Sequence, residues 1–150
     1  MAVQIRRAHL TDEAALRSVR LRAIRELVTP ALSVEQAEAW AVSAASDRMA
    51  RALREHDVWV AVDADVIGWV EVDQDRVAAL YVAPAVARRG VGSSLLRLAE
   101  TVIASASYPS VRLDASQNAL GFYLRRGYVR SGPQAADGSW PLRKELPTLV

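Results

Sequence analysis

The chain has 150 residues, contains no cysteine and carries a formal net charge of +2 from 19 basic and 17 acidic side chains. This length suffices for one domain with one well-buried core, and the composition, 51% hydrophobic and 24% charged, is globular. The absence of cysteine excludes a disulfide framework, a thiolate metal site and a cysteine nucleophile, and so small a net charge does not indicate a nucleic-acid-binding protein.

No apolar run reaches the roughly 18–20 residues that a helix needs to cross a bilayer, and residues 1–7 lack the apolar core of a signal peptide. We therefore expect a cytoplasmic protein that forms a single domain over residues 1–150 and has no membrane partner. The sequence leaves a homodimer open.

The amino-terminal part is expected to form one strand and one helix. Residues 3–6 alternate apolar and polar side chains, which predicts a short strand with one covered face. Thr11 is a good helix N-cap, and the helix that follows ends at residues 29–30. Its apolar stripe consists of Leu16, Val19, Ala23 and Leu27. Its arginines lie mostly outside the stripe and indicate a solvated face rather than a nucleic-acid patch: Arg17, Arg20, Arg22 and Arg25.

Two further helices are expected before the sheet continues. Ser33 and Gln36 have the spacing of a capping box and begin a short helix. The next helix covers residues 47–55, with Met49 and Leu53 facing inward.

From residue 57 the apolar period changes to two, which predicts an antiparallel meander of strands at residues 58–62, 66–72 and 77–82. Alternation gives the second strand two faces, with Trp69, Glu71 and Asp73 on one and Val66, Val70 and Val72 on the other. Glu71 is thus a carboxylate in the middle of a sheet, and it either pairs with an arginine or has a functional role.

Residues 77–103 are the most informative stretch, because a strand leads through a glycine loop into a long helix. Pro84 ends the strand, since proline brings no N–H group to a sheet. Two arginines and two glycines then lead into the helix: Arg88, Arg89, Gly90 and Gly92. The first backbone N–H groups of a helix have no intrahelical partner and lie at the positive end of its dipole, so they bind phosphate. The same loop also fits an ordinary turn with two solvated arginines.

The carboxyl-terminal part completes the sheet. A strand at residues 111–113 should run parallel to that at 77–82, because a helix separates them, and the crossover should be right-handed. Such strands leave a slot at their carboxyl ends where α/β sheets bind ligands. The last helix covers residues 118–126, with Gly127 as its left-handed C-terminal residue. Two more strands follow, at residues 128–130 and 140–146.

Two segments resemble the signatures of the GNAT superfamily of N-acetyltransferases. Leu-Tyr-Val-x-Pro at residues 80–84, followed by Arg-Arg-Gly-Val-Gly at residues 88–92, resembles its acetyl-CoA signature. Asn-Ala-Leu-Gly-Phe-Tyr-Leu-Arg-Arg-Gly-Tyr at residues 118–128 is similar to its second signature in a shortened spacing. Ala87 departs from the Gln or Arg of the loop pattern, and Tyr128 replaces Phe.

The resemblance implies an α/β fold with a mixed, mostly antiparallel sheet of about six to seven strands, helices on both faces and a splay between two parallel central strands. It implies acetyl-CoA as the cofactor, with its diphosphate at the glycine loop and its pantetheine arm along a free strand edge. The implied cofactor-binding residues are Leu80, Tyr81, Val82, Arg88, Arg89, Gly90, Val91, Gly92, Ser93 and Asn118. No metal site is expected.

The resemblance further implies transfer of an acetyl group to a primary amine of a small molecule or protein. It assigns Tyr123 as the general acid for the departing thiolate, a role for which a phenol of pKa about 10 needs a modest downward shift. A backbone N–H group near Val82 is the expected oxyanion donor.

The general base is less constrained. Glu71 is the first candidate, followed by Glu26 and Asp73, with ordered water as a further alternative. His9 and His56 lie at element boundaries and are expected to be exposed loop residues rather than bases. Without a cysteine nucleophile, we expect direct attack in a ternary complex.

The acceptor is not identified by any motif. Its pocket is expected to form from residues 31–40 and the turns of the meander, where Glu35, Trp40, Trp59 and Trp69 either line an acceptor site or belong to the core. Alternatives are an enzyme with another acyl group or a hydroxyl acceptor, and a CoA-binding regulatory module without turnover.

Overall fold

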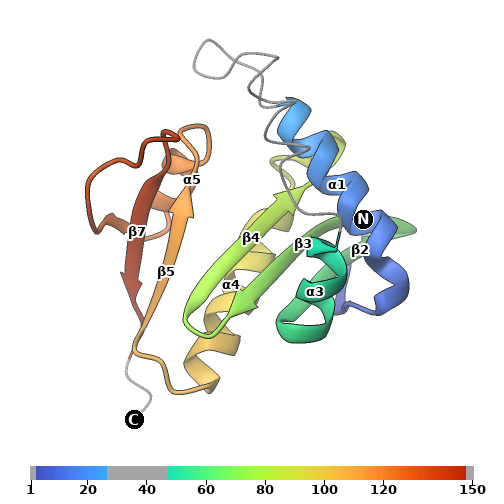
Figure 1. The fold of residues 1–150 in the computed structure, drawn as a ribbon, viewed down its shortest axis with the longest axis horizontal. Helices are drawn as coiled ribbons and strands as arrows, with labels where there is room; N and C mark the ends of the chain where they lie inside the picture. Colours follow the sequence, from blue (N-terminus) through green and yellow to red (C-terminus); the bar gives the residue numbers. More distant parts are fainter. Residues whose placement is uncertain (1–2, 27–46, 148–150) are drawn as a thin grey trace.

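The structure is a computed structural model that describes residues 3–26 and 47–147 (Figure 1). This part of the chain contains the strands β1 (Gln4–Arg7), β2 (Asp57–Asp63), β3 (Asp65–Asp73), β4 (Arg76–Val82), β5 (Ser110–Ala115), β6 (Val129–Arg130) and β7 (Trp140–Glu145). They form one seven-stranded sheet in the order β1-β2-β3-β4-β5-β7-β6. β4 and β5 run parallel, and the other neighbours are antiparallel.

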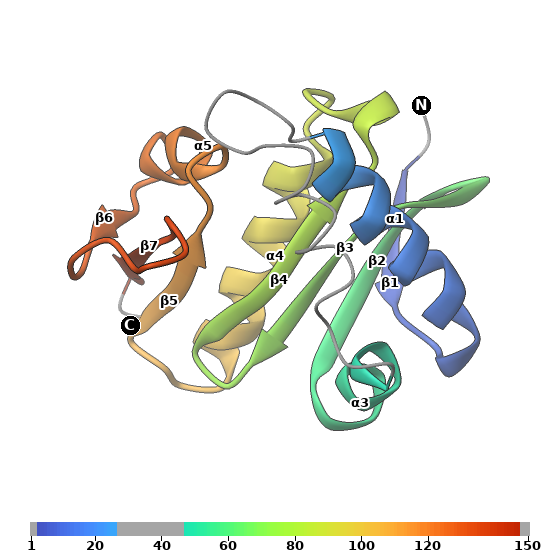
Figure 2. The same ribbon diagram turned by 45° about the horizontal axis from the view of Figure 1, so that its top comes forward.

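Helices cover both faces of this sheet. α1 (Glu13–Glu26) and α3 (Arg48–Glu55) lie on one face of the β1–β4 part, and α4 (Val91–Ser105) lies on the other (Figure 2). The short helix α5 (Leu120–Leu124) follows β5, and two 3-10 turns complete the list, η1 (Leu10–Asp12) and η2 (Pro84–Val86). The predicted fold class is therefore confirmed. Among the described residues, no helix is long and apolar enough to cross a membrane.

The sheet separates two hydrophobic clusters. Trp69 and Met49 belong to the cluster under α1 and α3, whereas Val70 and Val72 belong to the larger cluster under α4, as the alternation predicted. Val66 was assigned to the wrong face, because it packs against the cluster of Trp69. The pairing of β2 with β3 shifts between Ala61 and Val62, and such a bulge rotates the strand locally.

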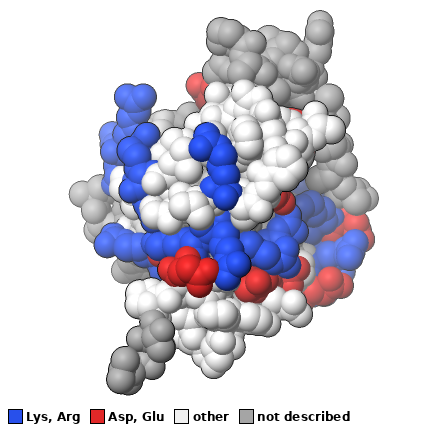
Figure 3. Space-filling view, turned by 90° about the vertical axis from the view of Figure 1, so that its left-hand side faces the viewer, with Lys and Arg blue, Asp and Glu red and all other residues white. Residues whose placement is uncertain are grey.

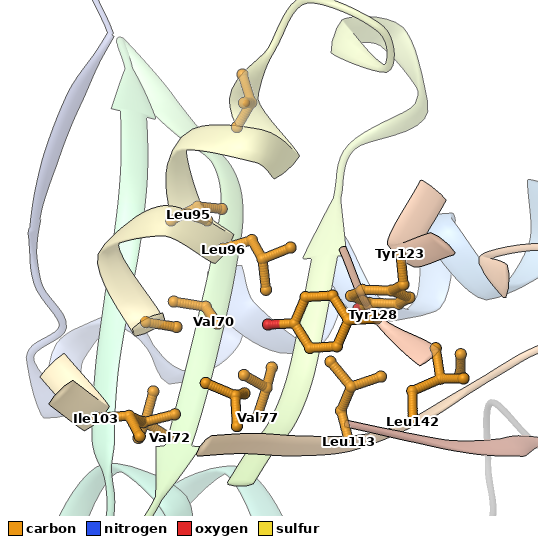
Figure 4. Packing of buried hydrophobic residues seen from close by; sticks show 14 of the residues in the cluster. Val70, Val72, Val77, Leu95, Leu96, Ile103, Leu113, Tyr123, Tyr128 and Leu142 are labelled. Atoms are coloured by element: carbon orange, nitrogen blue, oxygen red, sulfur yellow. The ribbon is translucent and has the colours of Figure 1, made fainter. Parts of the chain in front are cut away.

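The larger cluster extends across the boundary between β4 and β5. Figure 4 shows the ring of Tyr128 among side chains of α4, β4 and β5, beside Leu96, Val77 and Leu113. Its hydroxyl donates a hydrogen bond to Glu100 Oε2 on α4 at 2.7 Å. Lys144 on β7 also binds Glu100, with Nζ at 3.1 Å from Oε2. These contacts attach the β5–β7 part of the sheet to α4.

Two element boundaries differ from the prediction. Thr11 does not cap the first helix, because a 3-10 turn begins at Leu10 and the Asp12 carboxylate accepts hydrogen bonds from the His9 amide and from Arg6. The last helix covers Leu120–Leu124 rather than residues 118–126, since Ser116 holds the preceding residues in a turn through the amide of Ala119. The helix predicted from Ser33 lies outside the described residues.

β4 and β5 pair at a single register position, Arg76 with Arg112, and then diverge. Figure 1 shows the two strands separating toward their carboxyl ends. The predicted splay is confirmed, and beyond Arg76 the edge of β4 that faces β5 is not paired with another strand of the described sheet.

The outer face of the β5–β7 part carries a band of basic side chains (Figure 3). On these strands, Arg112 of β5 and Arg143 of β7 are register partners, and both are exposed. Each has an acidic partner, with Arg112 Nε at 2.9 Å from Asp75 Oδ1 and Arg143 Nη2 at 2.6 Å from Glu145 Oε1. This mixture of charges is typical of a solvated face.

Gly68 provides a test of how tightly β3 packs against α4. A Cβ atom at this buried position would lie 3.1 Å from Leu95 Cδ1 and from the Tyr81 carbonyl oxygen, and 3.2 Å from Val91 Cγ1. Because a backbone atom cannot move aside easily, we expect Gly68→Ala to lower the free energy of unfolding by about 1–3 kcal/mol in urea titrations. In the control Gly121→Ala, the new methyl group meets only the flexible end of Arg125. An equal loss of stability in both variants would contradict this account.

Candidate active site

The amino terminus of α4 forms a cradle of unpaired backbone N–H groups. Gly90 precedes the helix with φ at 81°, a left-handed conformation that favours glycine. The first hydrogen bond of the helix runs from the Ser94 amide to the Gly90 carbonyl at 3.0 Å. The amides of residues 91–93 are therefore available to an anion, at the positive end of a helix dipole.

Gly92 brings this cradle close to its neighbours. A Cβ atom there would lie 3.5 Å from the Phe122 ring and 3.5 Å from Val82 Cγ2. The first turn of α4 thus packs between the end of β4 and α5. An anion on the cradle would lie beside the end of β4.

Arg126 is a cation at this cradle that sequence reasoning missed. Its Nε and Nη2 atoms donate to Ser93 Oγ at 2.9 and 2.6 Å, and its Nη1 donates to the Phe122 carbonyl at 2.8 Å. The guanidinium also lies 3.7 Å from the centre of the Phe122 ring. Arg88 and Arg89, which the sequence proposed, are both exposed. The signal for Arg126 was its place four residues after Phe122 in the second signature.

The edge of β4 that faces β5 carries unpaired backbone groups near the end of the strand, beside the cradle. The Ala83 amide donates to the Ile67 carbonyl at 2.8 Å, and in an antiparallel pair the hydrogen-bonding direction alternates along the strand. The N–H and C=O groups of Tyr81 therefore face β3. Those of Leu80 and Val82 face the splay, where no strand of the described sheet pairs with them.

A cavity of about 600 Å³ occupies the splay. Pro84 and Ala87, which precede the cradle, line one end, and α1, α3 and β5 supply the remaining walls. Its lining includes Arg20, Glu26, Arg48, Leu80, Tyr81, Val82, Asp114, Ser116, Ala119 and Tyr123. Asn118 is an exposed residue of the loop before α5 and is not among the lining residues.

Tyr123 is buried in the wall of this cavity, with 7% of its surface exposed. Its ring packs edge-on against Phe122 and Tyr128, with centroids 5.1 and 5.6 Å away. Within the described residues its hydroxyl has no hydrogen-bond partner. Burial raises the pKa of the phenol well above its ordinary value, and the nearby Tyr81 adds to the rise. The expected downward shift is therefore wrong, and the phenol stays protonated at neutral pH.

Glu71 lies in a separate charged cluster beneath α3. It is 2% exposed, and its oxygens bind Arg48 Nη2 at 2.9 Å and His56 Nδ1 at 2.5 Å. His56 also lies 3.5 Å from Asp73 through Nε2. His56 is thus a half-buried member of this cluster, so its prediction as an exposed loop residue was wrong. His9 is exposed, as predicted.

The candidate bases are divided between two cavities. Glu71, Asp73 and His56 line a cavity of about 360 Å³, whereas Glu26 lines the larger cavity together with Tyr123. Arg48 lines both. Within residues 3–26 and 47–147, no group of three or more His, Asp or Glu side chains is placed to hold a metal ion.

The tryptophans of the meander do not line the larger cavity. Trp69 is fully buried and donates from Nε1 to the Leu16 carbonyl at 3.0 Å, which makes it a core residue. Trp59 is half-buried and lies beneath the Arg7 guanidinium, 5.6 Å from the ring centre. Glu35 and Trp40 lie outside the described residues.

Comparison with known proteins places this geometry in context. Residues 28–141 match the sequence profile of the acetyltransferase (GNAT) domain. The uncharacterized N-acetyltransferase YafP of Escherichia coli K12 is 31% identical over 141 residues, which cover 92% of this chain and 90% of YafP. A GCN5-related N-acetyltransferase from Rhodopseudomonas palustris superposes with a TM-score of 0.88 at 25% identity, over 97% of both chains. The PaiA N-acetyltransferase of Thermoplasma acidophilum, solved in complex with coenzyme A, superposes with a TM-score of 0.77 at 20% identity, over 97% of this chain and 100% of PaiA.

Proposed function

The chain belongs to the GNAT family of acetyltransferases, and from that premise we propose that it transfers an acetyl group from acetyl-CoA to a primary amine of a small molecule or protein. The transfer occurs by direct attack in a ternary complex. One observation carries the proposal: the cavity lined by the unpaired edge of β4 is also lined by Tyr123, and it lies beside the amide cradle of α4. PaiA, which shares the fold, binds coenzyme A.

The residues of the cradle fit a diphosphate. The amides of residues 91–93 offer hydrogen bonds at a helix amino terminus, and the Arg126 guanidinium adds a fixed positive charge nearby. The free N–H and C=O groups of Leu80 and the free C=O group of Val82 fit the amide groups of a pantetheine arm, which would extend the sheet at the edge of β4. Tyr81 contributes its side chain to the cavity rather than its main chain.

Acetyl-CoA supplies the acetyl group as a thioester. In the proposed reaction a neutral amine forms the C–N bond while the C–S bond breaks. The Val82 N–H group stabilises the negative charge that develops on the carbonyl oxygen. Tyr123 gives its phenolic proton to the leaving sulfur. Burial raises the pKa of Tyr123. The same apolar environment disfavours a charged thiolate and so raises the pKa of the leaving thiol as well. The pKa of the proton donor and that of the acceptor therefore shift in the same direction.

For the general base, the geometry favours Glu26 over Glu71. Both oxygens of Glu71 are engaged by Arg48 and His56, and Glu71 lines the smaller cavity. Glu26 lines the larger cavity with Tyr123 and is exposed, so it can pass the amine proton to solvent. We therefore propose Glu26, directly or through water, as the base, and Glu71 as the counter-ion of Arg48.

Replacement of Tyr123 by phenylalanine tests the acid. We expect kcat to fall by about 10²–10⁴-fold, because the leaving thiolate loses its proton donor. The dissociation constant of CoA, measured by calorimetry, should change by no more than about twofold, since packing of the ring is retained. Turnover of Tyr123→Phe at the wild-type rate would remove the acid assignment. Binding of acetyl-CoA without thiol release, across a panel of amines, would instead indicate a regulatory module.

Replacement of Arg126 by methionine tests the cradle. We expect the dissociation constant of CoA to rise about tenfold, because a fixed charge near the diphosphate is lost. Arg125→Met is the matched control, since Arg125 is exposed and adjacent in sequence. If both variants bind CoA equally well, Arg126 does not contact the phosphates.

Replacement of Glu26 by glutamine tests the base. At neutral pH, kcat/KM should fall about tenfold or more, and the deficit should close as the pH approaches about 10, where a free alkylamine is already neutral. Glu13→Gln, at the other end of α1, serves as the control. A deficit that is the same at every pH would show that Glu26 does not accept the proton.

A further inference from the structure

Arg48 is the first residue of α3 and lines both the cavity of about 600 Å³ and that of about 360 Å³. Its guanidinium binds Glu71, whose register partner on β4 is Ala79, and residues 77–82 of β4 line the larger cavity. The cation therefore lies in the wall of the cavity that holds Tyr123, away from the cradle of α4. Nothing in the acetyl-transfer chemistry described above uses it.

Among the described residues, the carboxylate of Glu71 is the one side-chain partner of this cation. Arg48 Nη2 binds Glu71 Oε1 at 2.9 Å, and the other oxygen of Glu71 is occupied by His56. The Glu71 side chain is 2% exposed, whereas that of Arg48 is 32% exposed. A guanidinium has five N–H donors in a planar fork that matches a carboxylate, so Arg48 retains donors for a ligand. Its orientation is set by a carboxylate that is itself immobilised.

β4 gives a scale for the separation of Glu71, the partner of Arg48, from the proposed reacting atoms. Glu71 pairs with Ala79, and Val82 lies three residues further along the strand. At about 3.3 Å per residue, the strand position beside Glu71 and the Val82 N–H group are about 10 Å apart. A ligand that reaches both must separate its amine from its charged group by several bonds.

We propose that Arg48 binds the carboxylate of the acceptor, and that the acceptor is an aliphatic amine with a carboxylate at its far end. This inference rests on the proposed acetyl transfer and names the substrate class of the same cavity. The amine lies near Val82 and Tyr123, and the carboxylate accepts hydrogen bonds from the free donors of Arg48.

The other charges of the cavity agree with such a ligand. Arg20, with 8% of its surface exposed, lies over the Tyr81 ring at 6.0 Å and adds positive potential on the same wall. Glu26, the proposed base, supplies negative charge in the same cavity. Asp114 lies across the cavity on β5, and Arg76 Nη2 lies 3.5 Å from its carboxylate. Of the described charged residues that line the wall formed by α1 and α3, two are basic, Arg20 and Arg48, and one is acidic, Glu26.

The test compares two amines of equal length, 6-aminohexanoate and its neutral amide, as acceptors for the wild-type protein. We expect kcat/KM to be about tenfold or more higher for the acid, since a charge-assisted pair with Arg48 is lost in the amide. Glycine, in which the amine and carboxylate are too close to reach both ends, should be a poorer acceptor than 6-aminohexanoate.

Variants of Arg48 assign this preference to its side chain. In Arg48→Met the ratio of kcat/KM between acid and amide should fall to about one, and in Arg48→Lys it should be intermediate, because the charge is kept but the fork is lost. Arg48→Lys also keeps a partner for Glu71, should the methionine variant fail to fold. The matched control is Arg51→Met, one turn further along α3, where the residue lines only the smaller cavity. Its ratio should equal that of the wild type.

The outcomes separate the two proposals. If the wild type acetylates the amide as well as the acid, or if Arg48→Met keeps the preference, the inference is overturned while acetyl transfer stands. If no amine releases thiol although CoA binds, acetyl transfer fails, and calorimetry with 6-acetamidohexanoate and its amide decides the inference. Preferential binding of the acid that is lost in Arg48→Met supports a carboxylate site, and equal binding of the two overturns it.

Discussion

The constraint on which this structure depends is the single register position, Arg76 with Arg112, at which β4 and β5 pair before they separate. A sheet that opens in this way loses the hydrogen bonds that would hold its halves together. The halves are joined instead by side chains on the α4 side, where Tyr123 and Tyr128 pack between α4, β4 and β5. Tyr128 also links the halves by a hydrogen bond, because its hydroxyl donates to the Glu100 carboxylate of α4, which also binds Lys144 of β7.

The opening has a chemical consequence on β4. Backbone N–H and C=O groups away from water require partners, and those of Leu80 and Val82 have none in the described sheet. An extended ligand with amide groups satisfies them as an added strand would. The first turn of α4 lies beside the end of β4, so that the helix amides are next to the free strand edge. The fold therefore leaves unsatisfied the groups that a thioester with a phosphate-bearing tail can satisfy.

Sequence reasoning was most successful where the signal is local. The strand at residues 77–82, the stop at Pro84 and the glycine-opened helix follow from propensities and capping within a few residues of one another, and all are present. The predicted helix boundaries were less accurate. Asp12 and Ser116 accept hydrogen bonds from nearby backbone amides, and these bonds shorten or shift the helices beside them. Side-chain partners across the fold could not be predicted. Arg126 meets Ser93 across 33 positions, and Arg48 meets Glu71 across 23. Neither pair has a spacing rule, because each depends on how strands and helices pack.

Arg126 and Arg48 are held in the same way, each by an oxygen atom of another side chain. Each is oriented by an oxygen of the protein, Ser93 Oγ for Arg126 and a Glu71 carboxylate for Arg48. A buried carboxylate such as Glu71 is costly to desolvate, and its ion pair contributes little net stability compared with well-packed apolar side chains. Its advantage is that the cation it fixes needs no reordering when a ligand arrives. Arg126 is thus a preorganised cation beside the amide cradle of α4, and Arg48 is another in the wall of the larger cavity. That arrangement suits the proposed reaction, in which two anionic molecules are aligned so that an amine meets a thioester between them.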